Sequence, residues 1–391
     1  MPPTSFMLIA GEASGDTLAA ELVTALKRHP ALTAAPFPPR FFGAGGPKMA
    51  AAGVELSFDL VSHAVFGVTE VLKDLGKFLR FFDELVALAV RRLPDVIILV
   101  DSGGLNLRVA KKLRALLRQR SKTFFDWNPK IVYYVSPQVW ASRPGRAYVL
   151  ADNVDLLISI FPFEKEWYAQ RTPSLPVAYV GHPMVDRHAS LANRAGDHSG
   201  AEPPLVAVLP GSRRQELRHH LPVMLDAIER IHGELPAHFR LILPDPGLAE
   251  TVRDAIGKRP HISVQTGGLA GTLAEAAAAI SKSGTITLEC GYFGLPTVVI
   301  YKLSWPMYWL ARQVVTVRHI AMPNLLAGET IFPELIQGDA TPRNIARETL
   351  DLLRNPSRRA EVTSKLANVR TQLGSPGAAT RAANAIVGLF G

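Results

Sequence analysis

The chain is poor in several features that would place it in a special class. Its 391 residues contain one cysteine, Cys290, so no internal disulfide can form. The opening residues lack the basic, apolar and small-residue order of a secretory signal peptide. Apolar runs such as 96–100 are too short to span a bilayer, and the longer stretch 298–310 is interrupted by Lys302 and Pro306. We therefore expect a cytoplasmic protein without a membrane span.

Common nucleotide, metal and nucleic-acid motifs are also missing. The loop at 11–16 lacks both the Gly-Lys-Ser/Thr ending of a Walker loop and GxGxxG spacing, which argues against ATP and dinucleotides. No second histidine or cysteine stands at zinc-binding spacing from His182, and no acidic pair indicates magnesium, so we expect no metal. His182 itself is expected to contact the ligand or the hinge. The basic residues are dispersed without a zinc-finger or RNA-binding aromatic signature, so we expect no nucleic acid.

Apolar residues and positive charge are abundant instead. A hydrophobic content of 48% in a chain of this length can fill two cores, so two domains are expected. The formal net charge of +9 favours anionic partners, which include phosphorylated metabolites and acidic lipid surfaces.

Short apolar runs alternate with amphipathic helical patterns, which predicts an α/β protein with parallel sheets. The first unit reads as a strand at 6–10, a turn at 11–16 and a helix at 18–26. Further strands or strand ends are expected at 43–46, 96–101, 131–135, 156–160, 205–209, 240–243, 262–264, 278–281 and 297–301.

Residues 188–204 are rich in small and polar types without apolar periodicity, and we place a linker there. We expect Rossmann-like domains at 1–188 and 189–364, with a C-terminal helix at about 365–391 that packs back on the first. Ligands of such sheets bind beyond the carboxyl ends of the strands, in a cleft between the halves.

Asp101 follows the apolar run 96–100 and precedes Ser102-Gly103-Gly104. An α/β enzyme places a catalytic carboxylate at such a point, where it can take a proton from a sugar hydroxyl that attacks an anomeric carbon. The alternative is an N-cap for a helix that begins near Leu107. Ser14 and Asp16, in the loop at 11–16, are likewise able to cap the helix after it.

The segment Ser283-Gly284-Thr285 precedes a helix-like run with Glu289 one turn inside. The first N–H groups of such a helix and its dipole can hold a pyrophosphate, and Glu289 can then reach ribose hydroxyls. An ordinary N-cap formed by Ser283 or Thr285 is the alternative.

The loop at 209–216 opens the second half in the same way. Gly211 and Ser212 offer backbone donors, and Arg213 offers a bidentate fork for phosphate. A capped turn with exposed arginines is the alternative.

Two basic amphipathic stretches, 65–92 and 301–318, combine large apolar side chains with lysine and arginine. Aromatic rings settle at headgroup depth while basic side chains pair with anionic lipid, although buried core is the alternative for the second stretch. The side chains expected to contact acyl chains or membrane are Phe66, Val68, Leu72, Trp305 and Trp309.

Eight motifs occur in one order over residues 8–337: GEASGD, FGAGGPKM, YYVSPQVWA, PFE, YVGHPMVD, LPGSR, SGTITLE and MPNLLAG. This ordered set resembles the lipid-A-disaccharide synthases of glycosyltransferase family 19. The resemblance implies a GT-B fold, with two Rossmann-like parallel-sheet domains facing across a cleft. It also implies inverting transfer of 2,3-diacylglucosamine from its UDP carrier to 2,3-diacylglucosamine 1-phosphate (lipid X), which gives the β-1,6-linked lipid A disaccharide 1-phosphate and UDP.

The resemblance implies roles residue by residue. Asp101 is the base for the acceptor hydroxyl and Arg213 contacts the donor diphosphate, while Glu12 and Ser14 match a loop that borders the reacting sugar. The other donor-side positions are Ser212, Ser283, Gly284, Thr285, Glu289 and Asn324. No cofactor is implied, and both acylated substrates imply peripheral attachment at the inner face of the cytoplasmic membrane.

Departures from the family pattern fall on the acceptor side. Where the family commonly has DxPDFN, with a second acidic residue, this chain has Gly104, and Ser142 replaces a tryptophan after VWA. Lys282 also enters the diphosphate loop region. Three alternatives therefore stay open: a paralogous glycolipid glycosyltransferase, a UDP-sugar 2-epimerase, and a non-catalytic UDP-sugar or lipid-binding protein.

Overall fold

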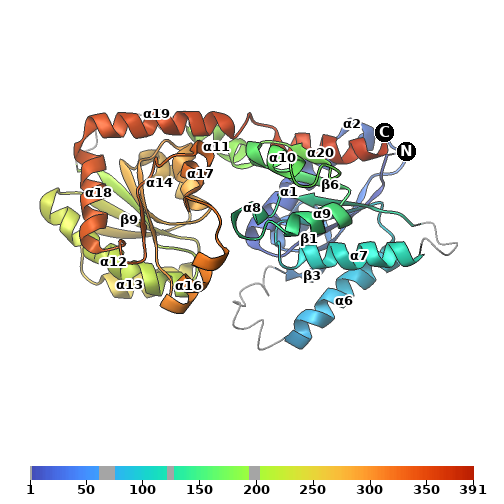
Figure 1. Cartoon of the computed structure of the whole chain (residues 1–391), viewed down its shortest axis with the longest axis horizontal. Coiled ribbons are helices and arrows are strands. Elements are labelled where there is room, and N and C mark those ends of the chain that lie inside the picture. The colour runs from blue at the N-terminus through green and yellow to red at the C-terminus, as the bar shows by residue number, and fades with distance from the viewer. Residues whose placement is uncertain (1, 61–74, 121–126, 193–202) are drawn as a thin grey trace. The chain divides into compact units, whose positions relative to one another are not determined.

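The computed structural model describes residues 2–60, 75–120, 127–192 and 203–391, which form two compact units (Figure 1). The first unit comprises Met1–Asp186 with Leu373–Gly391, and the second comprises Arg187–Gln372. The division after Asp186 lies close to the boundary expected at residue 188. The returning C-terminal segment begins at Leu373, not near residue 365, because helix α19 (Pro356–Gln372) belongs to the second unit.

The first unit contains a parallel sheet of seven strands in the order β3-β2-β1-β4-β5-β6-β7, so the prediction of a parallel α/β fold is confirmed. The strands are β1 (Ser5–Ala10), β2 (Arg40–Gly45), β3 (Glu55–Asp59), β4 (Val96–Val100), β5 (Lys130–Tyr134), β6 (Leu156–Ser159) and β7 (Val177–Tyr179). Strands β1 and β4 are buried along their whole length, as expected for strands covered on both faces.

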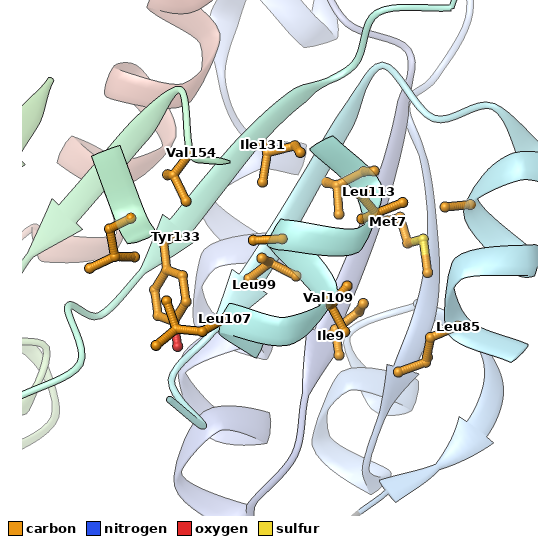
Figure 2. Close-up of a cluster of buried hydrophobic side chains, with 14 of the residues drawn as sticks. Met7, Ile9, Leu85, Leu99, Leu107, Val109, Leu113, Ile131, Tyr133 and Val154 are labelled. Carbon is orange, nitrogen blue, oxygen red and sulfur yellow. The ribbon is translucent and has the colours of Figure 1, made fainter. Parts of the chain in front are cut away.

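Helices cover this sheet and complete its core. They are α1 (Ala13–Lys27), α2 (Pro30–Thr33), α3 (Pro47–Ala51), α6 (Leu75–Arg92), α7 (Asn106–Arg120), α8 (Val139–Ser142), α9 (Arg146–Asn153), α10 (Pro162–Ala169) and α20 (Ala378–Val387), followed by a 3₁₀ turn at Gly388–Phe390. Helix α11 (Met184–Ala192) begins in the first unit and continues into the second. Figure 2 shows Met7, Ile9 and Leu99 of the central strands packed against Leu113 of α7 and Leu85 of α6.

The second unit contains a parallel sheet of six strands in the order β10-β9-β8-β11-β12-β13. The strands are β8 (Leu205–Leu209), β9 (His238–Leu243), β10 (Ile262–Thr266), β11 (Ala278–Lys282), β12 (Thr297–Tyr301) and β13 (Glu334–Ile336). The remaining helices are α12 (Arg214–Glu234), α13 (Pro246–Ile256), α14 (Leu269–Glu275), α15 (Ile286–Tyr292), α16 (Trp305–Val314), α17 (Met322–Ala327), α18 (Pro342–Arg354) and α19. None of the helices in the described ranges is long and apolar enough to cross a bilayer.

Asp186, the last residue of the YVGHPMVD motif, fastens the returning chain to the first unit. Its carboxylate accepts the N–H groups of Gly377 and of Ala378 (3.0 Å), where α20 begins. From within α20, Arg381 donates through Nε to the carbonyl of Val180 at 2.7 Å. The motif therefore has a structural role, which is to cap a helix almost at the other end of the sequence.

Replacing Asp186 by alanine should loosen α20. Two N–H groups at the start of the helix lose a charged acceptor, so we expect a loss of about 1–3 kcal/mol in the free energy of unfolding and faster amide exchange across α20. Asp254→Ala, on the exposed side of α13, is the matched control and should change the free energy of unfolding by less than about 0.5 kcal/mol. Unchanged exchange in Asp186→Ala would contradict this role.

Candidate active site

The strand order of the first unit reverses between β1 and β4, and this places two site loops together. Ala10 pairs with Val100 at the carboxyl ends of these strands, so the loops that follow leave the same edge of the sheet side by side. A Cβ atom at Gly11 would lie 2.6 Å from Oγ of Ser102, so a side chain here would force Ser102 to move. Ligands of α/β proteins bind at such a reversal point.

Asp101 and Ser102 have left-handed backbone conformations, with φ of 52° and 47°. Such a conformation costs of order 1–3 kcal/mol for each non-glycine residue and persists only where neighbours enforce it. Here the Asp101 carbonyl accepts a hydrogen bond from the Tyr133 hydroxyl at 2.6 Å and another from Nδ2 of Asn106 at 2.9 Å. The Asp101 N–H donates to the carbonyl of Tyr134 at 3.0 Å. Three hydrogen bonds from neighbouring strand and helix residues thus fix a strained residue, which is typical of a functional site.

Asn106 and Tyr133 were not among the expected site residues. Asn106 is completely buried, and its side-chain amide also donates to the Val100 carbonyl at 2.9 Å. The ring of Tyr133 lies in the apolar cluster of Figure 2. They hold the backbone of Asp101. The signal was their place in the family motifs, because Asn106 ends the DxPDFN pattern and Tyr133 opens YYVSPQVWA, whereas an asparagine at a helix start and a tyrosine in a strand are otherwise ordinary.

The Asp101 carboxylate lies in surroundings that favour its neutral form. Burial raises the pKa of this carboxyl above its ordinary value, and the negative charge of Glu12 raises it further. Hydrogen bonds from the Ser102 backbone and from Oγ of Ser14, at 3.4 Å, oppose the rise. The turn into α7 is closed by the carbonyl of Ser102, which accepts the N–H groups of Leu105 and Asn106, so the N-cap alternative for Asp101 is not what the structure shows.

Asp16 has a different role from the expected cap. Helix α1 already begins at Ala13, so Ser14 and Asp16 lie inside it and cannot cap it. The Asp16 carboxylate instead accepts the N–H groups of Gly46 (2.9 Å), Lys48 and Met49 (both 3.0 Å) at the start of α3. The first motif thus holds the second, FGAGGPKM, in place.

Two further motifs support each other in the same way. Trp140 donates from Nε1 to the Glu164 carboxyl at 3.0 Å, which joins VWA to PFE inside the first unit. Burial raises the pKa of Glu164 to about 7. His182 is also buried, and its Nδ1 accepts the Met184 N–H at 3.2 Å, so it forms part of the packing before the division between the units.

The departure at Gly104 lies in an open part of the site loop. A Cβ atom at this position would meet no heavy atom within 4 Å. A side chain would therefore fit, and its absence leaves the loop after Asp101 with less polar surface than the family pattern. Ser142 ends helix α8, next to the buried Trp140.

In the second unit the strand order reverses between β8 and β11. Leu209 pairs with Ser281, so the loop that carries Ser212 and Arg213 and the loop that carries 283–285 leave the same edge of this sheet. Arg213 is exposed at the N-cap position of α12. The N–H of Ser212 donates to Oε2 of Glu216 at 2.8 Å, so a carboxylate of the chain itself lies in this loop.

The loop 283–285 does not form a simple helix cap. Thr285 occupies the N-cap position of α15 without a side-chain capping bond and is exposed. Ser283 donates from Oγ to the Ile320 carbonyl at 2.8 Å, and Thr287 donates from Oγ1 to the Gly284 carbonyl at 2.7 Å. The capping alternative is therefore not observed, and the Ser283 hydroxyl instead joins this loop to the segment before α17.

Glu289 lies in α15 within 3.6 Å of Nε2 of His188, and both side chains are largely buried. The His188 ring also lies 5.4 Å from the ring of Phe293. His188 was not predicted as a site residue, since it is distant in sequence from the motif it touches.

Asn324 is placed where it cannot contact a ligand without losing its own bonds. It is completely buried, and its Nδ2 donates to the Phe332 carbonyl and to Oε1 of Glu334, both at 2.8 Å. Its Oδ1 accepts the N–H groups of Ile331 (2.9 Å) and Phe332 (2.8 Å). Asn324 and Glu334 thereby hold the segment that meets Ser283.

Helix α16 contains no buried residue, so the buried-core alternative is wrong for residues 305–314 of this stretch. Trp305 and Trp309 are 62% and 60% exposed, and Met307 and Leu310 are similarly exposed. Lys302 is turned inward and donates to the carbonyls of residues 337 and 340, which leaves Arg312 and Arg318 as the exposed basic residues of the stretch. The other expected contacts, Phe66, Val68 and Leu72, lie outside the described residues.

A family model described as lipid-A-disaccharide synthetase matches residues 6–387. The chain belongs to this family. A lipid-A-disaccharide synthase of Myxococcus xanthus is 40% identical over 99% of this chain and 98% of the relative. A second, from Nitrosococcus oceani, is 38% identical over 94% of this chain and 92% of the relative. The resemblance seen in the motifs is confirmed, and the chain is a glycosyltransferase.

Solved structures show the same fold at low identity. A putative UDP-N-acetylglucosamine 2-epimerase from Listeria monocytogenes matches with a TM-score of 0.65 and 17% identity, covering 100% of this chain and 97% of that one. A calicheamicin glycosyltransferase matches with a TM-score of 0.62 and 16% identity, covering 99% of both chains. The GT-B fold class is confirmed, whereas the fold alone does not separate a transferase of this family from an epimerase.

The surroundings of Asp101 predict two opposite shifts in its pKa. Glu12→Gln removes a negative charge and should lower the pKa of Asp101, whereas Ser14→Ala removes a hydrogen bond to the carboxylate and should raise it. Both shifts are measurable by NMR titration of protein labelled at aspartate carboxyl carbons, with Asp101→Asn identifying the signal. Glu84→Gln, an equal charge change on an exposed position of α6, is the control. Shifts of the same sign in the first two variants would contradict this description.

Proposed function

We propose that the chain transfers 2,3-diacylglucosamine from UDP-2,3-diacylglucosamine to 2,3-diacylglucosamine 1-phosphate, and so forms the β-1,6-linked lipid A disaccharide 1-phosphate and UDP. The family membership supports the reaction class. The observation that carries the proposal is Asp101, a half-buried carboxylate on a strained backbone at the strand-order reversal of the first unit. The site has two expected halves, the loops around Asp101 in the first unit and the loops around Arg213 in the second. Both half-sites lie at strand-order reversals, where α/β proteins bind ligands.

Asp101 acts as the general base in this proposal. It takes the proton of the acceptor 6-hydroxyl as that oxygen bonds to the anomeric carbon of the donor sugar, while the bond to the UDP oxygen breaks with its electron pair. Attack opposite the leaving group inverts the anomeric centre. A raised pKa suits this step because a base works best when its pKa lies close to the working pH. Glu12 and Ser14 border the reacting sugar and tune the base.

Groups of the second unit receive the departing UDP. Arg213 offers two parallel N–H bonds to phosphate, and the exposed Thr285 and Gly284 lie on the neighbouring loop. Glu289 binds the ribose hydroxyls, and His188 keeps it in place. Because Arg213 and the N-terminal end of α12 supply positive charge to the diphosphate, we propose that the transfer needs no metal ion.

A UDP-sugar 2-epimerase is the alternative at the level of the fold. It acts on a soluble sugar and gains nothing from acyl chains, so dependence of turnover on acylated substrates separates the two. The second alternative is a transferase that acts on a related glycolipid acceptor, because the loop position at Gly104 is open. The third is a non-catalytic binding protein, which would show no turnover at all.

Mutations in the two half-sites should have different effects when transfer is assayed with both lipid substrates in EDTA. Asp101→Asn should lower the transfer rate by about 10²- to 10⁴-fold with nearly unchanged UDP affinity, because a base acts on the rate and not on donor binding. Arg213→Ala should instead weaken UDP binding by about tenfold or more, through loss of a charged hydrogen-bond donor. Weakened UDP binding in Asp101→Asn would contradict its assignment, and loss of wild-type activity in EDTA would contradict a metal-free step.

Peripheral attachment to an anionic membrane surface is proposed for helix α16. Its tryptophans and leucine are exposed, and Arg312 in the helix and Arg318 beyond it provide positive charge that complements acidic headgroups. Both substrates carry acyl chains, so the enzyme has to reach them at the inner face of the cytoplasmic membrane.

Replacing Trp305 and Trp309 together by serine should weaken binding to vesicles of phosphatidylglycerol and phosphatidylethanolamine by about tenfold, because interfacial tryptophan burial is lost. Cosedimentation measures this, and circular dichroism should show an unchanged fold because the side chains are exposed. Phe37→Ser, at an equally exposed aromatic residue of the first unit, is the matched control. Full vesicle binding by the double variant would rule out this surface.

A further inference from the structure

Glu216 occupies the position expected for an anionic ligand in the second unit. Its Oε2 accepts the Ser212 N–H at 2.8 Å, and its Oε1 accepts from Nζ of Lys282 at 2.9 Å. A Cβ atom at Gly211 would lie only 2.6 Å from Oε2, so the carboxylate is seated directly against the backbone of the loop. Glu216 therefore uses the Ser212 N–H, one of the backbone donors that the sequence predicts for a phosphate ligand.

Lys282 is the cation that this arrangement adds to the site. It ends strand β11 and lies against the neighbouring loop, where a Cβ atom at Gly284 would be 3.3 Å from its Nζ. The side chains of Lys282 and Glu216 are only 18% and 20% exposed. Burial alone would raise the pKa of Glu216, but the hydrogen bond and charge of Lys282 lower it below its ordinary value, so the carboxylate is ionised.

The backbone beneath Glu216 is held independently of this ion pair. Nε2 of His220 accepts the Lys302 N–H at 3.0 Å, so this nitrogen carries no proton and Nδ1 donates to the Glu216 carbonyl at 2.8 Å. Burial lowers the pKa of His220, which agrees with the neutral ring. The first turn of α12 is thus joined to the end of β12, and the Glu216 side chain can turn away without moving the helix.

We propose that the Glu216 carboxylate and the donor diphosphate compete for the Ser212 N–H and the Lys282 ammonium, and that Lys282 becomes a phosphate ligand when the diphosphate takes the place of the carboxylate. The inference rests on the proposed donor site. A diphosphate carries more negative charge than a carboxylate, so it attracts the Lys282 ammonium more strongly. Arg213, which lies beside Ser212, then binds the diphosphate as well. Glu216 then sets a limit on donor affinity and keeps Lys282 oriented between turnovers.

The test compares the affinities of UDP and uridine, measured by titration calorimetry or ligand-observed NMR. Glu216→Gln removes the competing charge and should bind UDP at least about threefold more tightly, with unchanged affinity for uridine. Lys282→Met should weaken UDP binding by about tenfold or more and leave uridine unaffected. The double variant should bind UDP more tightly than Lys282→Met, because the Ser212 N–H no longer has a competing carboxylate, and more weakly than Glu216→Gln, because the ammonium is absent.

Glu275→Gln is the matched control, because Glu275 forms an ion pair with Arg240 elsewhere in the same unit. It should bind both ligands as the unaltered chain does. Weaker or unchanged UDP binding in Glu216→Gln would overturn the competition, and equal changes for UDP and uridine would show a merely structural effect.

Arg213→Ala separates this inference from the proposed function. If Arg213→Ala weakens UDP binding and Glu216→Gln does not strengthen it, the donor site stands and the competition fails. If the unaltered chain binds no UDP, the donor site itself fails.

Discussion

All strands in each sheet run parallel, and the strand order in each sheet reverses once. Because neighbouring parallel strands end at the same edge of a sheet, the two loops at the reversal leave that edge side by side. The chain segments that follow them diverge, so a crevice opens between the loops in which a ligand can bind. In the first unit the loops after β1 and β4 meet in this way, with Gly11 against Ser102. In the second unit the loops after β8 and β11 meet, with Glu216 and Lys282 paired across them. The positions of all the proposed reacting groups follow from this constraint.

Asp101, the proposed base, has a strained backbone that hydrogen bonds from neighbouring residues hold in place. Asp101 adopts a backbone conformation that asparagine and aspartate tolerate better than most residues, and Tyr133 and Asn106 bind its carbonyl from the buried side. The same burial that fixes the backbone also raises the pKa of the carboxyl. One arrangement therefore supplies both the position and the proton affinity that a general base needs.

The sequence predicted the central strands well, because a strand buried on both faces is a continuous apolar run. The edge strands β3 and β13 were missed, since Glu55–Asp59 alternates polar and apolar residues and Glu334–Ile336 is only three residues long. The family motifs predicted Asp101 and Arg213 as site residues. Hydrophobic periodicity and motif spacing describe local structure only, and they carry no information on contacts between segments that are distant in the sequence. The roles of Asp16, Asn324 and Glu216 depend on such contacts, and so does the exposure of Trp305.

The measurement that tests the account most directly is the mass of the lipid formed by the purified protein from UDP-2,3-diacylglucosamine, with and without 2,3-diacylglucosamine 1-phosphate. We expect a disaccharide 1-phosphate and an equal amount of UDP, both formed only when the acceptor is present. Release of UDP without disaccharide, or UDP binding without any turnover, would contradict it.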